Sequence, residues 1–364
     1  MTVAPPVRYN PSYEQPQSDE AQTIDGFKDS FRSIMETTRK DYGHAVRGVH
    51  AKGHGIVTGT FTVLPGLPPE LAQGLFASPG SYEAILRFST SPGDILDDGV
   101  SSPRGVALKV LGVSGERLPE SDDGDQDFVM VNGPVFGAST PAAFLKNLKL
   151  LAATTDKAEG LKKAWSATLR VLEGALEAVG GSSVLISSLG GAPETHPLGE
   201  TYFSQTAYRY GDLIAKFSLA PVSPGLTERT GDKVDVAGRP DALREDVREV
   251  IVEQGGTWEL RVQFCRDLEK MPVEDPTVLW DEKLSPFVTV ATVEAAPQIS
   301  WENGHSQRRE DALSFSPWHG LAAHQPLGAI NRVRREAYEF SANYRAEANG
   351  CPMHQVKQLE DLDD

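Results

Sequence analysis

Apolar residues recur at helical spacing near the start of the chain. Between residues 24 and 42 they lie mostly three or four positions apart, at Ile24, Phe27, Phe31, Ile34 and Met35, and Gly43 follows. This spacing predicts one amphipathic helix that ends at the glycine. Residues 141–150 and 157–179 are rich in Ala, Leu and Lys, which predicts two further helices. Residues 1–20, rich in Pro, Gln and Tyr, predict an extended, poorly packed arm.

The middle of the chain has the alternating, β-branched pattern of strands. The pattern is clearest in residues 56–63, where Ile, Val, Thr and Phe predominate. Further strands are predicted at 83–89, 105–111, 127–131, 203–208, 213–217, 257–264 and 287–293. Strands in the middle with helices toward the ends predict an α+β fold, built on an antiparallel sheet or barrel.

Residues 331–348 predict a helix that carries candidate chemistry. They contain neither Gly nor Pro, with Gly328 before them and Gly350 after them. At 3.6 residues per turn, Arg334, Tyr338 and Arg345 fall on one stripe of this helix. An arginine one turn from a tyrosine can stabilise a phenolate. The alternative is a solvated surface helix with scattered charges, and the motif alone does not decide between the two.

Composition limits the classes of partner. A formal net charge of −16 on 364 residues argues against binding nucleic acid or an anionic membrane. The sequence has no apolar run of 18 residues and no recognisable signal peptide. Its two cysteines, Cys265 and Cys351, provide no disulfide framework and fit a reducing compartment. We therefore expect a globular protein of the cytoplasm with no membrane span.

His50 is a second candidate for chemistry. It lies three residues after Arg47 and ahead of a Gly-rich stretch that would permit close approach of a ligand. A purely structural histidine is the alternative. Metal binding together with His54 is disfavoured, because Gly53 and Gly55 would weaken the helix that such spacing requires. The sequence also has no Walker A loop and no GxGxxG motif, so nucleotide binding has no support.

Four blocks, in order along the chain, resemble the motifs of haem catalases. Residues 47–53 (RGVHAKG) are similar to the distal-histidine motif of that family, Arg-x-Val-His-Ala-Lys-Gly. Residues 86–90 (LRFST) and 103–109 (PRGVALK) resemble two of its strands, Val-Arg-Phe-Ser-Thr and Pro-Arg-Gly-Phe-Ala-Val-Lys. Arg334, Tyr338 and Arg345 match the spacing of its proximal helix. The resemblance is weakest over residues 150–200.

The resemblance implies a fold and a division of the chain. We expect an antiparallel β-barrel core with flanking helices, a catalase-like haem fold without the C-terminal helical domain of full-size catalases. Residues 1–364 would form a single haem domain. It would consist of the arm (1–20), an N-terminal helix, barrel and helical insertion (21–300), a proximal helix region (301–350) and an acidic tail (351–364).

The resemblance also implies a role for each matching residue. Tyr338 would ligate the iron of haem b (iron protoporphyrin IX) as a phenolate, which Arg334 would keep deprotonated. His50 would be the distal acid–base, with a hydrogen bond to Ser89. The remaining residues would hold the cofactor: Arg47, Arg87 and Arg345 through the haem propionates, and Phe144 as part of the aromatic wall beside the distal face. Cys351, which precedes Pro352, is the alternative axial ligand.

The distal asparagine is the main departure from the family. Catalases have Asn-x-x-Pro, whereas this chain has Asn132-Gly133-Pro134. Counted without gaps from Asp127, the catalytic position falls on Val131. A one-residue bulge would bring Asn132 into that position, and on this condition Asn132 is predicted to be catalytic. The proximal block also differs, because it reads Arg-Glu-Ala-Tyr where the family has Leu-Phe-Ser-Tyr.

These features predict a haem peroxidase. It would reduce hydrogen peroxide or organic hydroperoxides through a ferryl intermediate, with a small organic molecule as the reductant. His50 would move a proton from one peroxide oxygen to the other. The altered asparagine region and the missing wrapping segment of full-size catalases favour peroxidase over catalase. A true catalase, a hydroperoxide-cleaving or isomerising enzyme similar to allene oxide synthases, and a haem-storage protein are the alternatives; a homo-oligomer is left open.

Overall fold

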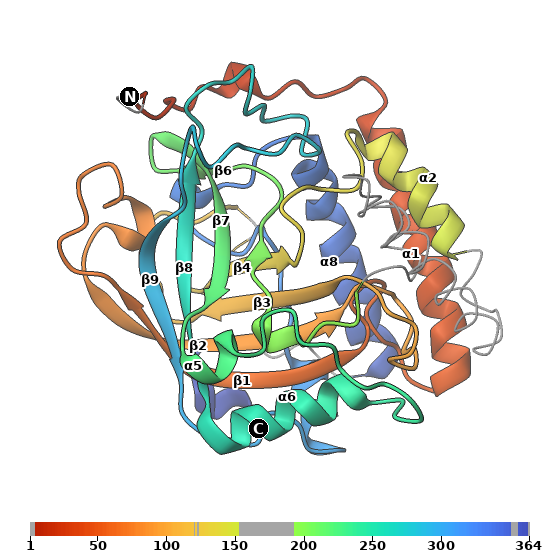
Figure 1. Ribbon diagram of the computed structural model, residues 1–364. Coiled ribbons are helices and arrows are strands. Elements are labelled where there is room, and N and C mark those ends of the chain that lie inside the picture. Colours follow the sequence, from red (N-terminus) through yellow and green to blue (C-terminus); the bar gives the residue numbers. More distant parts are fainter. Residues whose placement is uncertain (1–3, 120, 122–123, 153–192, 351–355, 363–364) are drawn as a thin grey trace, which may run out of the picture.

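Eight antiparallel strands close into a barrel at the centre of the fold (Figure 1). The computed structural model describes residues 4–119, 121, 124–152, 193–350 and 356–362. Around the barrel the strands follow the order β4-β3-β2-β1-β9-β8-β7-β5, and β5 pairs with both β7 and β4, which closes the ring. Their bounds are β1 (Gly53–Val63), β2 (Gly80–Thr90), β3 (Arg104–Val110), β4 (Gln126–Val131), β5 (Tyr202–Phe203), β7 (Leu213–Pro221), β8 (Gly256–Phe264) and β9 (Val288–Ala295). The short β6 (Tyr208–Tyr210) pairs with β7 outside the ring.

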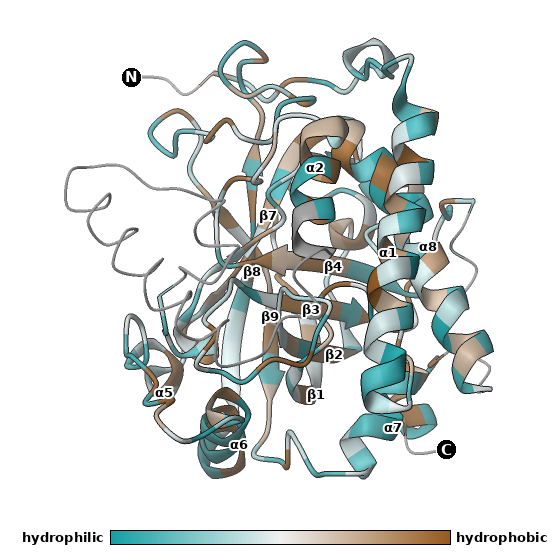
Figure 2. Ribbon diagram, turned by 90° about the vertical axis from the view of Figure 1, so that its right-hand side faces the viewer, coloured by the Kyte–Doolittle hydropathy of each residue, from teal (hydrophilic) through white to brown (hydrophobic). Residues whose placement is uncertain are grey.

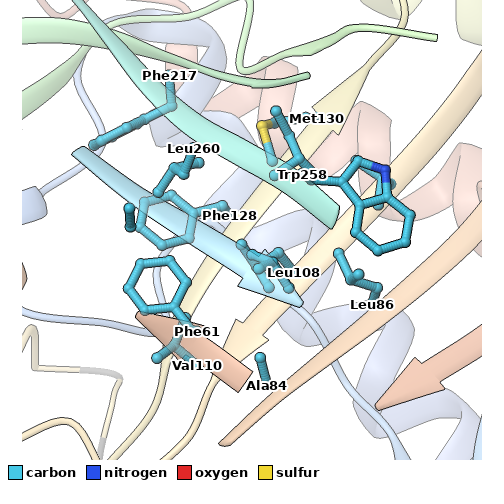
Figure 3. Close-up of a cluster of buried hydrophobic side chains, with 14 of the residues drawn as sticks. Phe61, Ala84, Leu86, Leu108, Val110, Phe128, Met130, Phe217, Trp258 and Leu260 are labelled. Carbon is cyan, nitrogen blue, oxygen red and sulfur yellow. The ribbon is translucent and has the colours of Figure 1, made fainter. Parts of the chain in front are cut away.

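Alternation along each strand separates the core from the outer wall. Leu86, Leu108 and Phe128 are cross-strand partners on β2, β3 and β4, and all three point into the barrel (Figure 3). Because successive side chains of a strand point to opposite faces, the next row of partners points outward. That row consists of Arg87, Ala107 and Val129. The barrel interior therefore buries apolar side chains, while the outer wall can carry polar side chains such as Arg87.

Three helices cover one side of this outer wall (Figure 1). They are α1 (Glu20–Tyr42), α2 (Pro141–Ala152) and α8 (Ala329–Asn349). Their mixed hydrophilic and hydrophobic surfaces are visible in Figure 2, and their apolar faces share one core that includes Phe27, Leu148 and Val333. Gly43, with φ +67°, ends α1 and donates a backbone hydrogen bond to Arg39, a conformation that glycine adopts without strain.

The remaining helices are shorter or lie elsewhere on the barrel. The helix α6 (Ala242–Gln254) packs beside β1, while α5 (Pro224–Thr227) and α7 (His305–Ala312) lie in connections. Short 3₁₀ turns complete the assignment: η1 (Pro11–Tyr13), η2 (Gly74–Phe76), η4 (Pro197–Gly199), η5 (Ala322–His324) and η6 (Leu359–Leu362). Among the helices in the described ranges, none combines the length and the apolarity needed to cross a lipid bilayer.

The predicted barrel with flanking helices is confirmed, and several local predictions are corrected. Residues 203–208 were predicted as one strand, but they divide between β5 and β6 because Gln205 adopts φ +61° between them. The helices α5, α6 and α7 were not predicted. The predicted helix over 157–179 lies outside the described residues.

The N-terminal arm is extended and none of its described residues is buried, but three of its side chains contact the rest of the protein. Val7, Tyr9 and Tyr13 pack against a buried cluster that includes Cys265 and Trp280. The backbone amide of Val7 donates to the carbonyl oxygen of Cys265 at 2.8 Å. The sequence did not indicate this packing because the apolar residues of the arm lack a regular spacing.

Leu108 tests the barrel core. Its side chain has no exposed surface, so Leu108→Ala is expected to lower the free energy of unfolding by about 3 kcal/mol through lost burial and the cavity left behind. The matched control is Val252→Ala on α6, whose side chain is 39% exposed and should change stability by less than about 0.5 kcal/mol. Chemical unfolding followed by tryptophan fluorescence measures both variants. Equal effects of the two substitutions would contradict the burial assigned to Leu108.

Candidate functional site

A cavity lies between the outer wall of β2, β3 and β4 and the helix α8. It measures about 620 Å³, counted out to its mouth. Residues from α1, from the loop before β1 and from the segment after α7 complete its wall. The lining residues are Phe31, Arg47, Val49, His50, Arg87, Ser89, Gly105, Val106, Ala107, Val129, Met130, Ser314, Phe315, Ala337, Tyr338, Ser341, Ala342 and Arg345. Most of the predicted site residues thus lie in one place, although the first and last of them are almost 300 positions apart in the sequence.

His50 is held against the barrel wall in a fixed orientation. Its Nδ1 lies 3.0 Å from the Ser89 hydroxyl, and its backbone oxygen accepts a hydrogen bond from Arg87 Nη2 at 2.9 Å. The backbone of His50 has φ +53°, a conformation that costs energy for a non-glycine residue. A Cβ at Gly105 would lie 2.5 Å from His50 Cε1. The ring can therefore lie close to β3 only because residue 105 is a glycine.

The surroundings of His50 keep its ring neutral. Burial, followed by the positive charges of Arg87, Arg334 and Arg47, lowers the pKa of His50 to about 3. At neutral pH the imidazole is consequently unprotonated. It can accept a proton from a molecule that enters the cavity.

Tyr338 approaches the same cavity from α8 and is bound by Arg334. Arg334 Nη2 donates to the Tyr338 hydroxyl oxygen at 3.2 Å, as expected for residues one turn apart. The other end of the guanidinium donates to Asn331 Oδ1 at 3.2 Å, and the buried Asn331 is itself bonded to the Leu327 and Ala207 carbonyl oxygens. Burial alone would lower the pKa of Arg334, but the adjacent Tyr338 and Tyr208 oxygens raise it. A permanent positive charge therefore lies against the phenol oxygen.

Three arginines meet beside the cavity around one carboxylate. Arg87 Nε lies 2.8 Å from both carboxylate oxygens of Glu310, and Arg47 forms a second ion pair with the same carboxylate. Arg345 donates to the backbone oxygen of Glu310 at 3.4 Å and to that of Leu313 at 3.3 Å. Burial would raise the pKa of Glu310, but Arg87 and Arg47 outweigh it and lower that pKa. The cluster contains three positive charges and one negative charge, so it retains a net charge of +2.

Six of the predicted site residues line the cavity together: Arg47, His50, Arg87, Ser89, Tyr338 and Arg345. Arg334 lies directly behind Tyr338. The sequence prediction therefore identified the residues of two opposing elements, the barrel wall and the helix. Their roles in binding a cofactor remain predictions at this point.

Asn132 is not among the described residues that line the cavity. The one-residue bulge that would bring Asn132 into the catalytic position does not occur within β4, which pairs with β3 in continuous register from Gln126 to Val131. The side-chain oxygen of Asn132 accepts a hydrogen bond from the backbone amide of Arg104 at 2.9 Å. Val131 instead lies in the outward row of Ser89 and Gly105. An apolar side chain therefore occupies the position that an ungapped count assigns to the distal asparagine.

Phe144 also lies away from the cavity-lining set. Its ring packs between Phe27 and Phe136, at centroid distances of 5.2 and 4.8 Å, in the core shared by α1, α2 and α8. Phe31 of α1 is the aromatic residue that reaches the cavity from this side. The helical spacing of α1 predicted that Phe31 would be buried, but that spacing cannot tell a cavity wall from a core.

Glu310 was missed by the sequence prediction. It lies in the polar stretch 305–312 (HSQRREDA), where one buried carboxylate cannot be distinguished from its solvated neighbours. Only its ion pairs with Arg47 and Arg87 mark it as part of the site. Local sequence gives no signal for a contact between residues 263 and 223 positions apart.

The structure resembles solved catalases. The crystal structure of a fungal catalase aligns with a TM-score of 0.62 at 20% identity, covering 89% of this chain and 63% of that protein. Catalase A from Saccharomyces cerevisiae aligns with a TM-score of 0.59 at 18% identity, covering 97% of this chain and 71% of that one. The sequence itself matches no protein-family model and no curated protein. The chain thus has a catalase-like fold, and at this identity the likeness defines the fold alone.

Glu310 provides a test of the arginine cluster. Glu310→Gln removes the one negative charge of the cluster and leaves Arg47 and Arg87 without a counterion, so the free energy of unfolding should fall by about 3 kcal/mol at pH 7. The exposed Glu302→Gln, from the segment just before α7, is the matched control and should have little effect.

The contribution of Glu310 to stability is expected to depend on pH. A carboxyl whose pKa is lowered in the folded state stabilises the fold above its ordinary value of 4.5, and this contribution disappears as pH falls through the lowered value. The stability difference between wild type and Glu310→Gln should therefore shrink below about pH 4.5. A difference that stays constant from pH 7 to pH 3 would contradict the ion pairs assigned to Glu310.

Proposed function

We propose that this protein is a haem-dependent peroxidase that reduces hydrogen peroxide or organic hydroperoxides. The observation that carries the proposal is the convergence of three features on one cavity. Tyr338 with its arginine lies on α8, a neutral His50 lies on the barrel wall, and a cationic cluster lies beside them. The resemblance of residues 47–53, 86–90, 103–109 and 334–345 to haem catalases supports the same assignment.

The donor set fits haem b. Tyr338 would ligate the iron as a phenolate, because the Arg334 guanidinium bound to its oxygen stabilises the anionic form. Arg47, Arg87 and Arg345 would bind the two propionates, whose negative charges balance the net charge of +2 that Glu310 leaves on the cluster. The cavity walls between these polar ends are apolar, with Phe31, Val129, Met130 and Phe315, and suit the porphyrin faces.

His50 would act as the acid–base for an incoming peroxide. Haem supplies the redox chemistry when bound. The neutral ring of His50 takes the proton from one peroxide oxygen and returns it to the other, which leaves as water or an alcohol. Ser89, hydrogen-bonded to Nδ1, holds the ring in the orientation for this transfer. The contact with Gly105 limits the ring to this position.

An apolar residue on the outer wall favours peroxidase over catalase turnover. Val131 lies in the row of Ser89 and Gly105 and offers no hydrogen bond to a second molecule of hydrogen peroxide. An organic reductant does not require that donor. Catalase activity is the second candidate, because the solved structures that this chain resembles are catalases.

Tyr338→Phe tests the iron ligand. The substitution removes the phenol oxygen, and the loss of haem affinity should exceed the roughly 10- to 100-fold that removal of an outer-shell group typically causes. The matched control is Tyr344→Phe on the same helix, because Tyr344 packs in the core of α1, α2 and α8. Absorption spectra of both variants after reconstitution with haem report the ligand. A Tyr338→Phe spectrum identical to that of wild type would assign the axial position to another residue, such as Cys351.

Val131→Asn tests the choice between peroxidase and catalase. Oxygen release from hydrogen peroxide and oxidation of a dye are measured side by side on the haem-loaded chain. Wild type is expected to favour dye oxidation. Val131→Asn should raise oxygen release relative to dye oxidation by roughly tenfold, because it adds a hydrogen-bond donor to the outward row that contains the cavity-lining Ser89 and Gly105.

Rapid oxygen release from wild type without dye oxidation would favour catalase. The comparison variant Asn132→Ala tests the catalytic role predicted for Asn132. A large fall in peroxide turnover at unchanged thermal stability would support that role, whereas unchanged turnover would remove it.

A further inference from the structure

Lys216 is a buried cation on a different side of the barrel. It lies in β7, where Ala215 and Phe217 belong to the interior core and Lys216 points to the outer wall. Only 4% of the residue is exposed, and its Nζ has no hydrogen-bond partner among the described residues. The nearest favourable contact is with the ring of Trp280, whose centroid lies 4.7 Å from Nζ.

Lys216 lines a second cavity, separate from the one described above, which measures about 300 Å³ counted out to its mouth. The rings of Phe203, Trp280 and Phe287 also line it, and Phe203 and Phe287 lie 5.9 Å apart between centroids. Gln205 and Gln263 also line the cavity, but their side-chain amide nitrogens already donate to backbone carbonyl oxygens. Lys216 is thus the cation that an entering molecule would meet.

The rim of this cavity carries one exposed apolar side chain and one exposed carboxylate. Leu279, which is 60% exposed, lines it together with the exposed Glu282. Leu284 and Val288, each 38% exposed, follow within the same segment. Among the large hydrophobic residues described as exposed, half therefore belong to this one segment, which extends from Leu279 to Val288. Of these three residues, Leu279 lines the cavity, and an exposed apolar side chain at the mouth of a pocket is common at binding sites.

We propose that this cavity binds a monocarboxylate with a short apolar body. The carboxylate would accept a hydrogen bond from Lys216 Nζ, and the body would lie against Phe203, Trp280 and Phe287. An unpaired buried cation is costly, so an anionic partner gains the interaction that the protein does not supply. Glu282 at the rim offsets the charge of Lys216, which disfavours dianions such as phosphate. The proposal does not rest on haem binding.

The charge state of Lys216 gives this site a signature. Burial lowers the pKa of Lys216 to about 8, and the negative charge of Asp275 opposes that shift. Burial raises the pKa of Cys265 to about 11, so the thiol stays neutral near pH 8. A bound carboxylate would raise the pKa of Lys216. Binding at pH 8 should therefore take up about half a proton, and binding at pH 6 almost none.

Calorimetric titration of the full chain with hexanoate tests the proposal. We expect saturable binding of one hexanoate per chain, with affinity lower by roughly tenfold or more in Lys216→Met. Lys283→Met, which removes an exposed lysine of the rim segment, should bind hexanoate like wild type. Hexan-1-ol, which has the same body without the charge, should bind far more weakly than hexanoate.

Three outcomes would overturn the proposed carboxylate site. They are the absence of saturable hexanoate binding, an affinity for hexan-1-ol equal to that for hexanoate, and an unchanged hexanoate affinity in Lys216→Met. If Lys216→Met does not fold, proton uptake by wild type still decides, measured at pH 8 in two buffers of different ionisation enthalpy. Hexanoate binding without proton uptake at that pH would place the ligand away from Lys216.

Discussion

Three arginines that contact Glu310 hold the candidate site together, and two of them, Arg87 and Arg345, are buried. Arg47 precedes β1, Arg87 belongs to β2 and Arg345 belongs to α8, while Glu310 comes from α7. The three guanidinium groups repel one another because they lie near each other in a medium of low dielectric constant. The negative charge of Glu310 offsets part of that repulsion. The same contacts fix the separation between the barrel wall and α8. That separation determines whether His50 and Tyr338 can act on one bound group.

The barrel supports this arrangement because each strand serves two purposes. Leu86 and Phe88 pack inside, while Arg87 and Ser89 between and after them reach the outer wall. The interior needs no polar residue for the chemistry, so the core can stay apolar and close-packed. On the outer wall, Gly105 leaves room for the ring of His50 to lie close to β3.

Local patterns predicted most of the strands and the helices α1 and α8, and the resemblance to catalase motifs predicted six of the residues that line the cavity. These elements have regular apolar spacing, and α8 has glycines at both ends, so sequence alone locates them. Glu310, Phe31 and the Lys216 cavity were not predicted as functional features, because each depends on contacts between distant segments. Gln205 and Val131 show a second limit. A single left-handed residue divided a predicted strand, and the register of β4 placed Val131 rather than Asn132 in the outward row.

Binding of haem by the full chain is the most direct test of the central claim. Titration of the purified protein with ferric haem, followed by absorption spectroscopy, should show saturation at one haem per chain and a spectrum of a phenolate-ligated ferric iron. We expect this result because Tyr338, His50 and the arginine cluster converge on one cavity. Absence of saturable uptake, or a spectrum without phenolate ligation, would contradict it.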